Sequence, residues 1–130
     1  MPITVTTLQD AFTHLAARIV DGYNDDVVLG KVQITASVAD DETADPAEAD
    51  CYSDEDIQRF REGSWKYIGI RLVVSASGIA GESTLWDVEN GLISDERDRE
   101  YYAQILGDLW QDIAARIADS ARDVAALASA

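Results

Sequence analysis

Apolar residues recur at helical spacing in the first segment of the chain. In TTLQDAFTHLAARIVDGY, the apolar positions lie three or four residues apart, at Leu8, Phe12, Leu15 and Ile19. This spacing predicts one buried face of a helix. Thr7 is suited to cap its start, and Gly22 stands where such a helix ends. Residues 31–39 then alternate between apolar and polar side chains, which predicts a strand with one wet face.

The middle of the chain carries a hairpin pattern. SWKYIGIRLVVSASGIAGESTLWDVE, residues 64–89, reads as two strands joined by a turn at SGIAG. Both faces of the first strand are partly apolar, so we expect a central strand that is covered on each side or shielded by aromatic rings. Just before it, Ser53 predicts the cap of a short helix that carries acids in its first turn, bases in its last, and Gly63 beyond.

A long amphipathic pattern closes the chain. Ser94 or Asp95 would cap a helix of about 34 residues, roughly 50 Å long. Because strands are usually about 17–20 Å long, we expect the helix to break near Gly107 or after Ala118, or to pack its last turns on a second copy. The predicted fold is α+β, a single domain over residues 1–130. A small antiparallel sheet of about three strands packs with an N-terminal helix, a short middle helix and the long C-terminal helix.

Charge is concentrated in one place. The chain has a net charge of −15, and residues 40–56 contribute nine acids and no base. Such a field disfavours direct binding to nucleic acid or anionic membranes and favours basic partners. No apolar stretch of about 20 residues is present for a membrane span. The single Cys51 excludes an internal disulfide and favours a reducing, cytoplasmic setting.

Catalytic chemistry is not indicated. His14 would be the base for a nucleophile, but its apolar neighbours favour a place on the helix surface or at the core edge. The carboxylates around Cys51 disfavour its thiolate. Glu82, Asp87 and Glu89 could seat an acid–base pair, although charges on an edge strand also protect against aggregation. Core packing is the simpler explanation of the tryptophans Trp65, Trp86 and Trp110. We expect no enzyme activity and no cofactor.

A metal site is not expected in the acidic segment. A helix–loop–helix calcium site needs a glycine at its sixth position. Counting from Asp40 or Asp45, that position holds Asp45 or Asp50. A weak divalent site is the alternative that the pattern leaves open.

The acidic loop, at about 39–52, is the best candidate for a binding site. Its carboxylates without a local role are Asp40, Asp41, Glu42, Asp45, Glu48 and Asp50. Two further pairs stand one turn apart on the long helix, Asp108 with Asp112 and Asp119 with Asp123. One interpretation of these acids is a solvated mobile loop. The other interpretation is a docking surface for a basic protein, in which the carboxylates approximate the charge density of DNA, about one charge per 1.7 Å of axis.

About half of the chain resembles small acidic proteins of bacterial viruses and prophages. These have a W-x-[YF]-[IV]-[GA]-[IV] strand followed by a [ST]-x-L-W-x-[IV]-E strand and an acidic helix that opens with a tyrosine. The matching residues here are Trp65, Tyr67, Ile68, Gly69, Ile70, Ser83 or Thr84, Leu85, Trp86, Val88, Glu89, Tyr101 and Tyr102. The resemblance implies a viral accessory origin and no particular activity.

Small acidic phage proteins include inhibitors of restriction and CRISPR enzymes, and this analogy of class shapes the functional hypothesis. The sequence predicts a non-enzymatic inhibitor in the cytoplasm of a bacterial host. It would bind a basic nucleic-acid-handling complex through the acidic residues. The alternative is a homodimeric structural or adaptor protein of phage origin, whose acidity serves only solubility.

Overall fold

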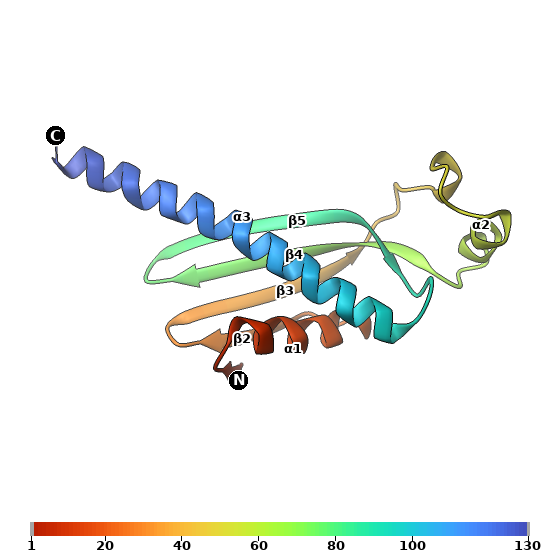
Figure 1. Ribbon diagram of the computed structural model, residues 1–130, viewed down its shortest axis with the longest axis horizontal. Coiled ribbons are helices and arrows are strands. Elements are labelled where there is room, and N and C mark those ends of the chain that lie inside the picture. Colours follow the sequence, from red (N-terminus) through yellow and green to blue (C-terminus); the bar gives the residue numbers. More distant parts are fainter. Residues whose placement is uncertain (1, 130) are drawn as a thin grey trace.

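The computed structural model describes residues 2–129, with side chains described up to Ile117. Its elements follow along the chain in this order (Figure 1): β1 (Ile3–Val5), α1 (Leu8–Val20), β2 (Asp25–Leu29), β3 (Val32–Asp40), a 3-10 turn η1 (Pro46–Glu48), α2 (Asp54–Arg61), β4 (Lys66–Ala76), β5 (Ile79–Asn90) and α3 (Asp95–Ser129). The predicted α+β class is confirmed.

The sheet has five strands in the order β1-β2-β3-β4-β5, so the predicted count of about three was wrong. β1 pairs with β2 in parallel and all other neighbours are antiparallel, which makes the sheet mixed. β1 has only three residues, and DDVVL in β2 lacks a clean alternation of apolar and polar positions. Both strands are specified by pairing with their neighbours rather than by a local pattern.

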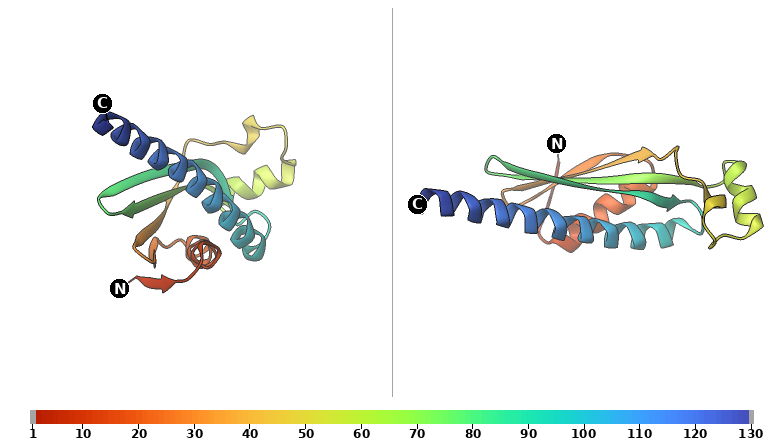
Figure 2. Two further views of the ribbon diagram at one scale, coloured as in Figure 1. Left: turned by 60° about the vertical axis from the view of Figure 1, so that its left-hand side comes forward. Right: turned by 90° about the horizontal axis from the view of Figure 1, so that it is seen from above.

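Both long helices cover the same face of the sheet (Figure 2). α1 contacts β2 and β3, while α3 crosses β4 and β5 and also packs along α1. Gly107 lies inside α3, and a Cβ atom added to it would lie 3.8 Å from the ring of Phe12 on α1. The core between the layers includes Leu15, Ile34, Ile70, Leu72, Tyr102 and Leu106. Within residues 2–129, no helix covers most of the other face of the sheet (Figure 2).

The helix ends follow the predicted capping. Thr7 accepts a hydrogen bond from the N–H of Asp10 at 3.0 Å, and Ser53 accepts one from Asp56 at 3.1 Å. Ser94 accepts the N–H of Arg97 at 3.1 Å. α3 continues without a break from Asp95 to Ser129. The prediction of a break near Gly107 or after Ala118 was therefore wrong, because one glycine costs a helix only about 1 kcal/mol and α3 gains contacts with α1 and the sheet.

The β4–β5 hairpin is confirmed and contains an irregularity. Ser77 and Gly78 both have positive φ, 51° and 79°, as the tight turn of a two-residue hairpin requires. Farther along, Ile68 pairs with Val88 and Ile70 pairs with Leu85. Two residues of β5, at positions 86 and 87, thus oppose one residue of β4, which defines a β-bulge. The bulge re-aims the side chains beside the acidic loop.

Candidate partner-binding surface

The acidic loop is fastened at its start by Asp41. This side chain is only 9% exposed and accepts a hydrogen bond of 3.0 Å from the main-chain N–H of Asp87 in the bulge. It also accepts a 2.9 Å hydrogen bond from the hydroxyl of Thr43. The main-chain N–H of Asp41 donates to Tyr67 on β4. Asp41 was predicted to have no local role, and that interpretation was wrong: its carboxylate joins the loop to the hairpin.

Asp41 and Asp87 form an unequal carboxylate pair. The hydrogen bond from the Asp87 N–H lowers the pKa of Asp41, with further donation from Thr43. A hydrogen bond to the Asp41 carboxyl and the like charge nearby raise the pKa of Asp87. Asp87 also has a positive φ of 59°, in the left-handed region that non-glycine residues rarely occupy. The bulge therefore holds Asp87 in a backbone conformation that is unfavourable for a non-glycine residue.

Aromatic rings hold the far end of the loop. Tyr52 donates a hydrogen bond to Glu89 and its ring lies 5.3 Å from that of Trp65. Burial and the neighbouring Glu89 raise the pKa of Tyr52. Phe60 of α2 packs within 5.7 Å of both Trp65 and Tyr67, measured between ring centroids. The indole N–H of Trp65 donates to the Asp56 carbonyl at 2.9 Å. This cluster fixes α2 and the loop on the sheet.

The remaining loop acids differ in their surroundings. Asp40 forms a solvent-exposed ion pair with Lys66 at 2.7 Å, and Asp45 caps η1 by accepting the N–H of Ala47. Glu42, Glu48 and Asp50 are exposed and make no side-chain hydrogen bond or ion pair with the described residues. Three of the six predicted loop acids thus have partners within the protein, and three side chains project into water without one among the described residues.

The predicted helix acids lie apart from the loop. Asp112 accepts hydrogen bonds from Ser83 of β5 at 3.0 Å and from Arg116 at 3.1 Å. Asp108 stands one turn earlier, is exposed, and has no partner among the described side chains. The side chains of Asp119 and Asp123 lie outside the described residues. The loop and α2 occupy the end of the molecule where α3 begins (Figure 1), so the loop acids and this side of α3 form two separate acidic areas.

Trp86 lies on the open face of the sheet, next to the loop. It is 52% exposed, so its predicted place in the core was wrong, whereas Trp65 is 2% exposed. Its ring lies on Gly69, where an added Cβ would come within 2.3 Å of the ring. A hollow of about 570 Å³ is lined by Asp40, Asp41, Glu42, Thr43, Trp86 and Asp87. The pairing of a glycine with a tryptophan across the hairpin is the sequence signal that points to this arrangement.

A second hollow shares Thr43 and Asp87 with the first. It measures about 460 Å³ and is lined by Thr43, Ala44, Asp45, Glu48, Ala49, Cys51, Tyr52, Tyr67 and Asp87. Carboxylates and exposed aromatic rings together attract guanidinium and ammonium groups through ion pairing and cation–π contacts. The anchored loop and Trp86 have the chemistry of a receptor for basic side chains.

His14 is part of the framework of the fold. Its Nε2 lies 2.9 Å from a carboxylate oxygen of Asp25 on β2, and the Nε of Arg18 lies 3.3 Å from the same oxygen. Burial alone would raise the pKa of Asp25, but the His14 hydrogen bond and the N–H of Asp26 lower it below its ordinary value. The histidine ties α1 to β2 at the edge of the core, the position that its neighbours predicted.

The three hairpin acids do not converge on one point. Glu82 pairs with Arg71, Glu89 with Arg97, and Asp87 lies against Asp41. Over the described part of the chain, no three His, Cys, Asp or Glu side chains gather closely enough to hold a metal ion. Within the same residues, no helix combines the length and apolar character that a membrane crossing needs.

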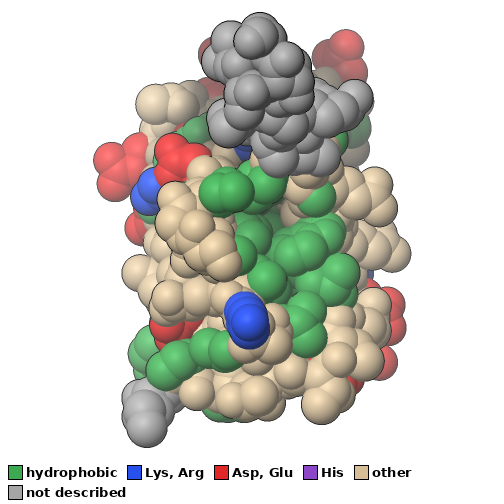
Figure 3. Space-filling view, turned by 90° about the vertical axis from the view of Figure 1, so that its left-hand side faces the viewer, with side chains coloured by type: hydrophobic (Ala, Val, Ile, Leu, Met, Phe, Trp, Pro, Cys, Tyr) green, Lys and Arg blue, Asp and Glu red, His purple; other side chains and the backbone are tan. Residues whose placement is uncertain are grey.

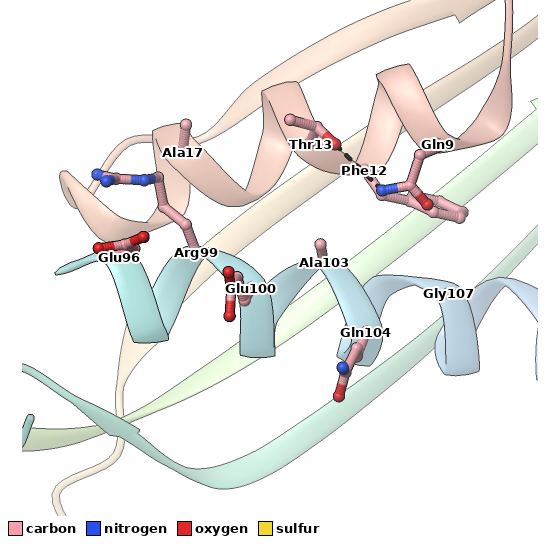
Figure 4. A pocket seen from close by; sticks show the side chains of 10 residues that line it. All are labelled: Gln9, Phe12, Thr13, Ala17, Glu96, Arg99, Glu100, Ala103, Gln104 and Gly107. Carbon is pink, nitrogen blue, oxygen red and sulfur yellow. Dashed lines mark hydrogen bonds between the residues drawn. The ribbon is translucent and has the colours of Figure 1, made fainter. Parts of the chain in front are cut away.

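A larger groove runs between α1 and α3. It measures about 810 Å³ and its lining residues are Gln9, Phe12, Thr13, Ala17, Glu96, Arg99, Glu100, Ala103, Gln104 and Gly107. Gln9 donates to Thr13 at 3.2 Å within α1. The lining side chains are distributed along the two helices rather than directed at a common centre (Figure 4). Nothing in this groove pairs a nucleophile with a base.

Comparisons with known proteins give no further guide. The sequence matches no protein-family model, and neither curated proteins nor solved structures provide a match.

Proposed function

We propose that this protein is a non-enzymatic inhibitor of phage type that acts in the cytoplasm of a bacterial host. It binds a basic, nucleic-acid-handling defence protein, of the CRISPR or restriction class, through the acidic loop. The observation that carries the proposal is the anchored loop with exposed, unpaired carboxylates at Glu42, Glu48 and Asp50, in a segment of nine acids and no base.

Anchoring supports a binding role for the loop. Asp41 at one end and Tyr52 at the other connect the loop to β4 and β5. Ordering a flexible segment upon binding costs conformational entropy, so a loop that is already held loses less on association. Carboxylates presented in this way also accelerate encounters with a positively charged surface.

Trp86 offers a partner an aromatic contact in addition to the attraction between charges. An arginine of the partner can stack on the exposed indole while its guanidinium faces Asp87 and Glu42 across the same hollow. Tryptophan and arginine are the residues that most often dominate binding energies at protein interfaces. The hollow would thus give geometric specificity to an attraction that is otherwise set by net charge.

Mimicry of a phosphate backbone is a further part of the proposal. Asp108 and Asp112 are about 6 Å apart along the axis of α3, one helical turn. Arg116 neutralises part of this pair, so the loop is the principal surface and α3 a secondary one. A surface of this kind would occupy the channel of a nuclease and exclude its nucleic acid.

Two triple variants with equal charge provide the test. Glu42→Gln, Glu48→Gln and Asp50→Asn neutralise the loop, and the control neutralises Asp21, Glu96 and Glu100, which are exposed elsewhere. Each variant has a net charge of −12, three units above −15. Tagged wild-type protein and both variants are incubated with bacterial host lysate at about 0.05 M and about 0.5 M salt.

The proposal predicts that wild type and control retain the same basic nucleic-acid-handling protein at low salt and release it at high salt. The loop variant should lose it at both. Equal retention by the loop variant and the control would contradict a role of the loop. That result would favour the alternative, a homodimeric structural or adaptor protein whose acidity serves only solubility.

A further inference from the structure

An apolar groove lies at the end of the molecule opposite the acidic loop. It measures about 270 Å³, and every lining residue is apolar: Val32, Val74, Ala76, Trp110, Ile113, Ala114 and Ile117. Figure 3 shows it as a continuous hydrophobic area with acidic side chains only toward the margins of the view. Ile79, 45% exposed, pairs with Ala76, which lines the groove.

The groove is partly open to solvent: Val74 and Ile113 are buried, Val32, Trp110 and Ile117 are half-buried, and Ala114 is exposed. α1 lies over β2 and β3, whereas α3 crosses the sheet obliquely toward the β4–β5 turn (Figure 1). Val32 is the first residue of β3, Val74 lies two residues before the end of β4, and the helical residues of the lining all belong to α3. Exposed apolar areas that are continuous mark interaction sites more often than isolated apolar residues do.

α3 is longer than the sheet that it covers. Its 35 residues span about 52 Å, against about 36 Å for the 11 residues of β4. The 12 residues after Ile117 extend about 18 Å farther. The apolar series of Ile113 and Ile117 continues in the sequence at Ala121, Val124 and Leu127. The sequence thus continues the helical spacing of apolar residues beyond the groove.

Charge favours a second copy at this end. The 12 residues after Ile117 contain Asp119, Arg122 and Asp123, a net charge of only −1. Beside the groove, Arg116 pairs with Asp112, and the exposed Lys31, which precedes Val32, pairs with no described residue. Two chains of −15 repel each other least where they present this nearly neutral, apolar surface.

We propose that the groove receives the C-terminal end of α3 from a second copy of the chain. The exchange is reciprocal about a two-fold axis, so that two α3 helices run antiparallel and each end covers the other copy's groove. This inference goes beyond the proposed function and rests on a different surface. The acidic loops lie at the far ends of such a dimer and remain accessible to a partner.

A pair of adjacent alanines offers a matched test. Ala114 lines the groove and Ala115 does not, yet both are exposed on the same helix. Analytical ultracentrifugation of wild type should give twice 14.2 kDa, or 28.4 kDa. Ala114→Glu should raise the dimer dissociation constant at least about tenfold by placing a charge in an apolar contact, and Ala115→Glu should leave it unchanged. Circular dichroism checks that both variants fold.

Disulfide trapping identifies the occupant of the groove. In a Cys51→Ser background, Ala114→Cys and Val124→Cys are ten residues apart on one helix, about 15 Å. That distance is too long for a bond within one chain, since bonded cysteines have Cα atoms within about 7 Å. A 114–124 disulfide between chains is the expected product. The proposal would be overturned if the wild type is a monomer, or if Ala114→Glu leaves the dimer dissociation constant unchanged. It would also be overturned if the double-cysteine variant forms a dimer without a disulfide between positions 114 and 124.

Discussion

Substituting Gly69 tests whether Trp86 is held on the sheet as described. An alanine Cβ at this position would come within 2.3 Å of the indole ring, whereas carbon atoms in contact lie about 3.5–4.0 Å apart. The ring must therefore move by more than 1 Å, a minimum that follows from the same contact distance. Because Trp86 is half-exposed, the ring can swing away from β4 rather than distort the backbone.

The expected cost follows from the buried area. A tryptophan buries about 200 Å² when it is enclosed, and with 52% exposure about half of that, roughly 100 Å², is in contact here. At about 25 cal/mol per Å², displacement costs about 2.5 kcal/mol. Replacing a glycine in a strand by alanine raises the free energy of unfolding by about 0.5–1 kcal/mol, because alanine loses less conformational entropy on folding. Gly69→Ala should therefore lower the free energy of unfolding by about 1.5–2 kcal/mol.

A double-mutant cycle isolates the contact. In a Trp86→Ala background no ring obstructs the new Cβ, so Gly69→Ala should stabilise the protein by about 0.5–1 kcal/mol. Urea unfolding followed by circular dichroism measures all four proteins. If Gly69→Ala changes the free energy of unfolding equally in both backgrounds, within about 0.5 kcal/mol, the contact with Trp86 is not what requires glycine.

Two further predictions concern the anchors of the loop. Because the pKa of Asp41 is lowered in the fold, its contribution to stability is present above its ordinary value of 3.8 and is lost as pH falls through the folded value. Asp41→Asn should therefore destabilise the protein at pH 7, with the difference shrinking below about pH 4 in a pH series of urea unfolding; a difference that grows at low pH would contradict this sign. Trp65→Phe removes the 2.9 Å hydrogen bond to the Asp56 carbonyl at a site that is 2% exposed. It should lower the free energy of unfolding by about 1–3 kcal/mol, and an unchanged urea midpoint would argue against this anchor.

Local chemistry explains which parts of the fold were predictable. Thr7, Ser53 and Ser94 cap the helices because their hydroxyls accept nearby N–H groups, an interaction within three residues. The hairpin was predictable for a similar reason, since alternation and turn residues are local signals. By contrast, the short strands β1 and β2 depend on neighbours elsewhere in the sheet.

The loop and Trp86 show what a sequence pattern does not reveal. Asp41 bonds a main-chain N–H 46 residues away, and Tyr52 bonds Glu89 across 37 residues. Strict alternation from Leu85 does not include the extra residue of the bulge, which reverses the facing of the side chains that follow it, so that Val88 faces the same way as Leu85. The acidic composition identified the candidate surface, but the long-range contacts of Asp40 and Asp41 and the local cap made by Asp45 separate its structural carboxylates from the unpaired ones.

Inhibition of DNA cleavage tests the central claim most directly. The account predicts that the wild-type protein retains a CRISPR or restriction enzyme, and that enzyme is assayed for cleavage with increasing amounts of wild type, the loop variant and the control of equal charge. The account predicts that the loop variant needs at least about tenfold more protein for half-inhibition, while the control stays within about twofold of wild type. Equal inhibition by both variants, or no inhibition by wild type, would contradict it.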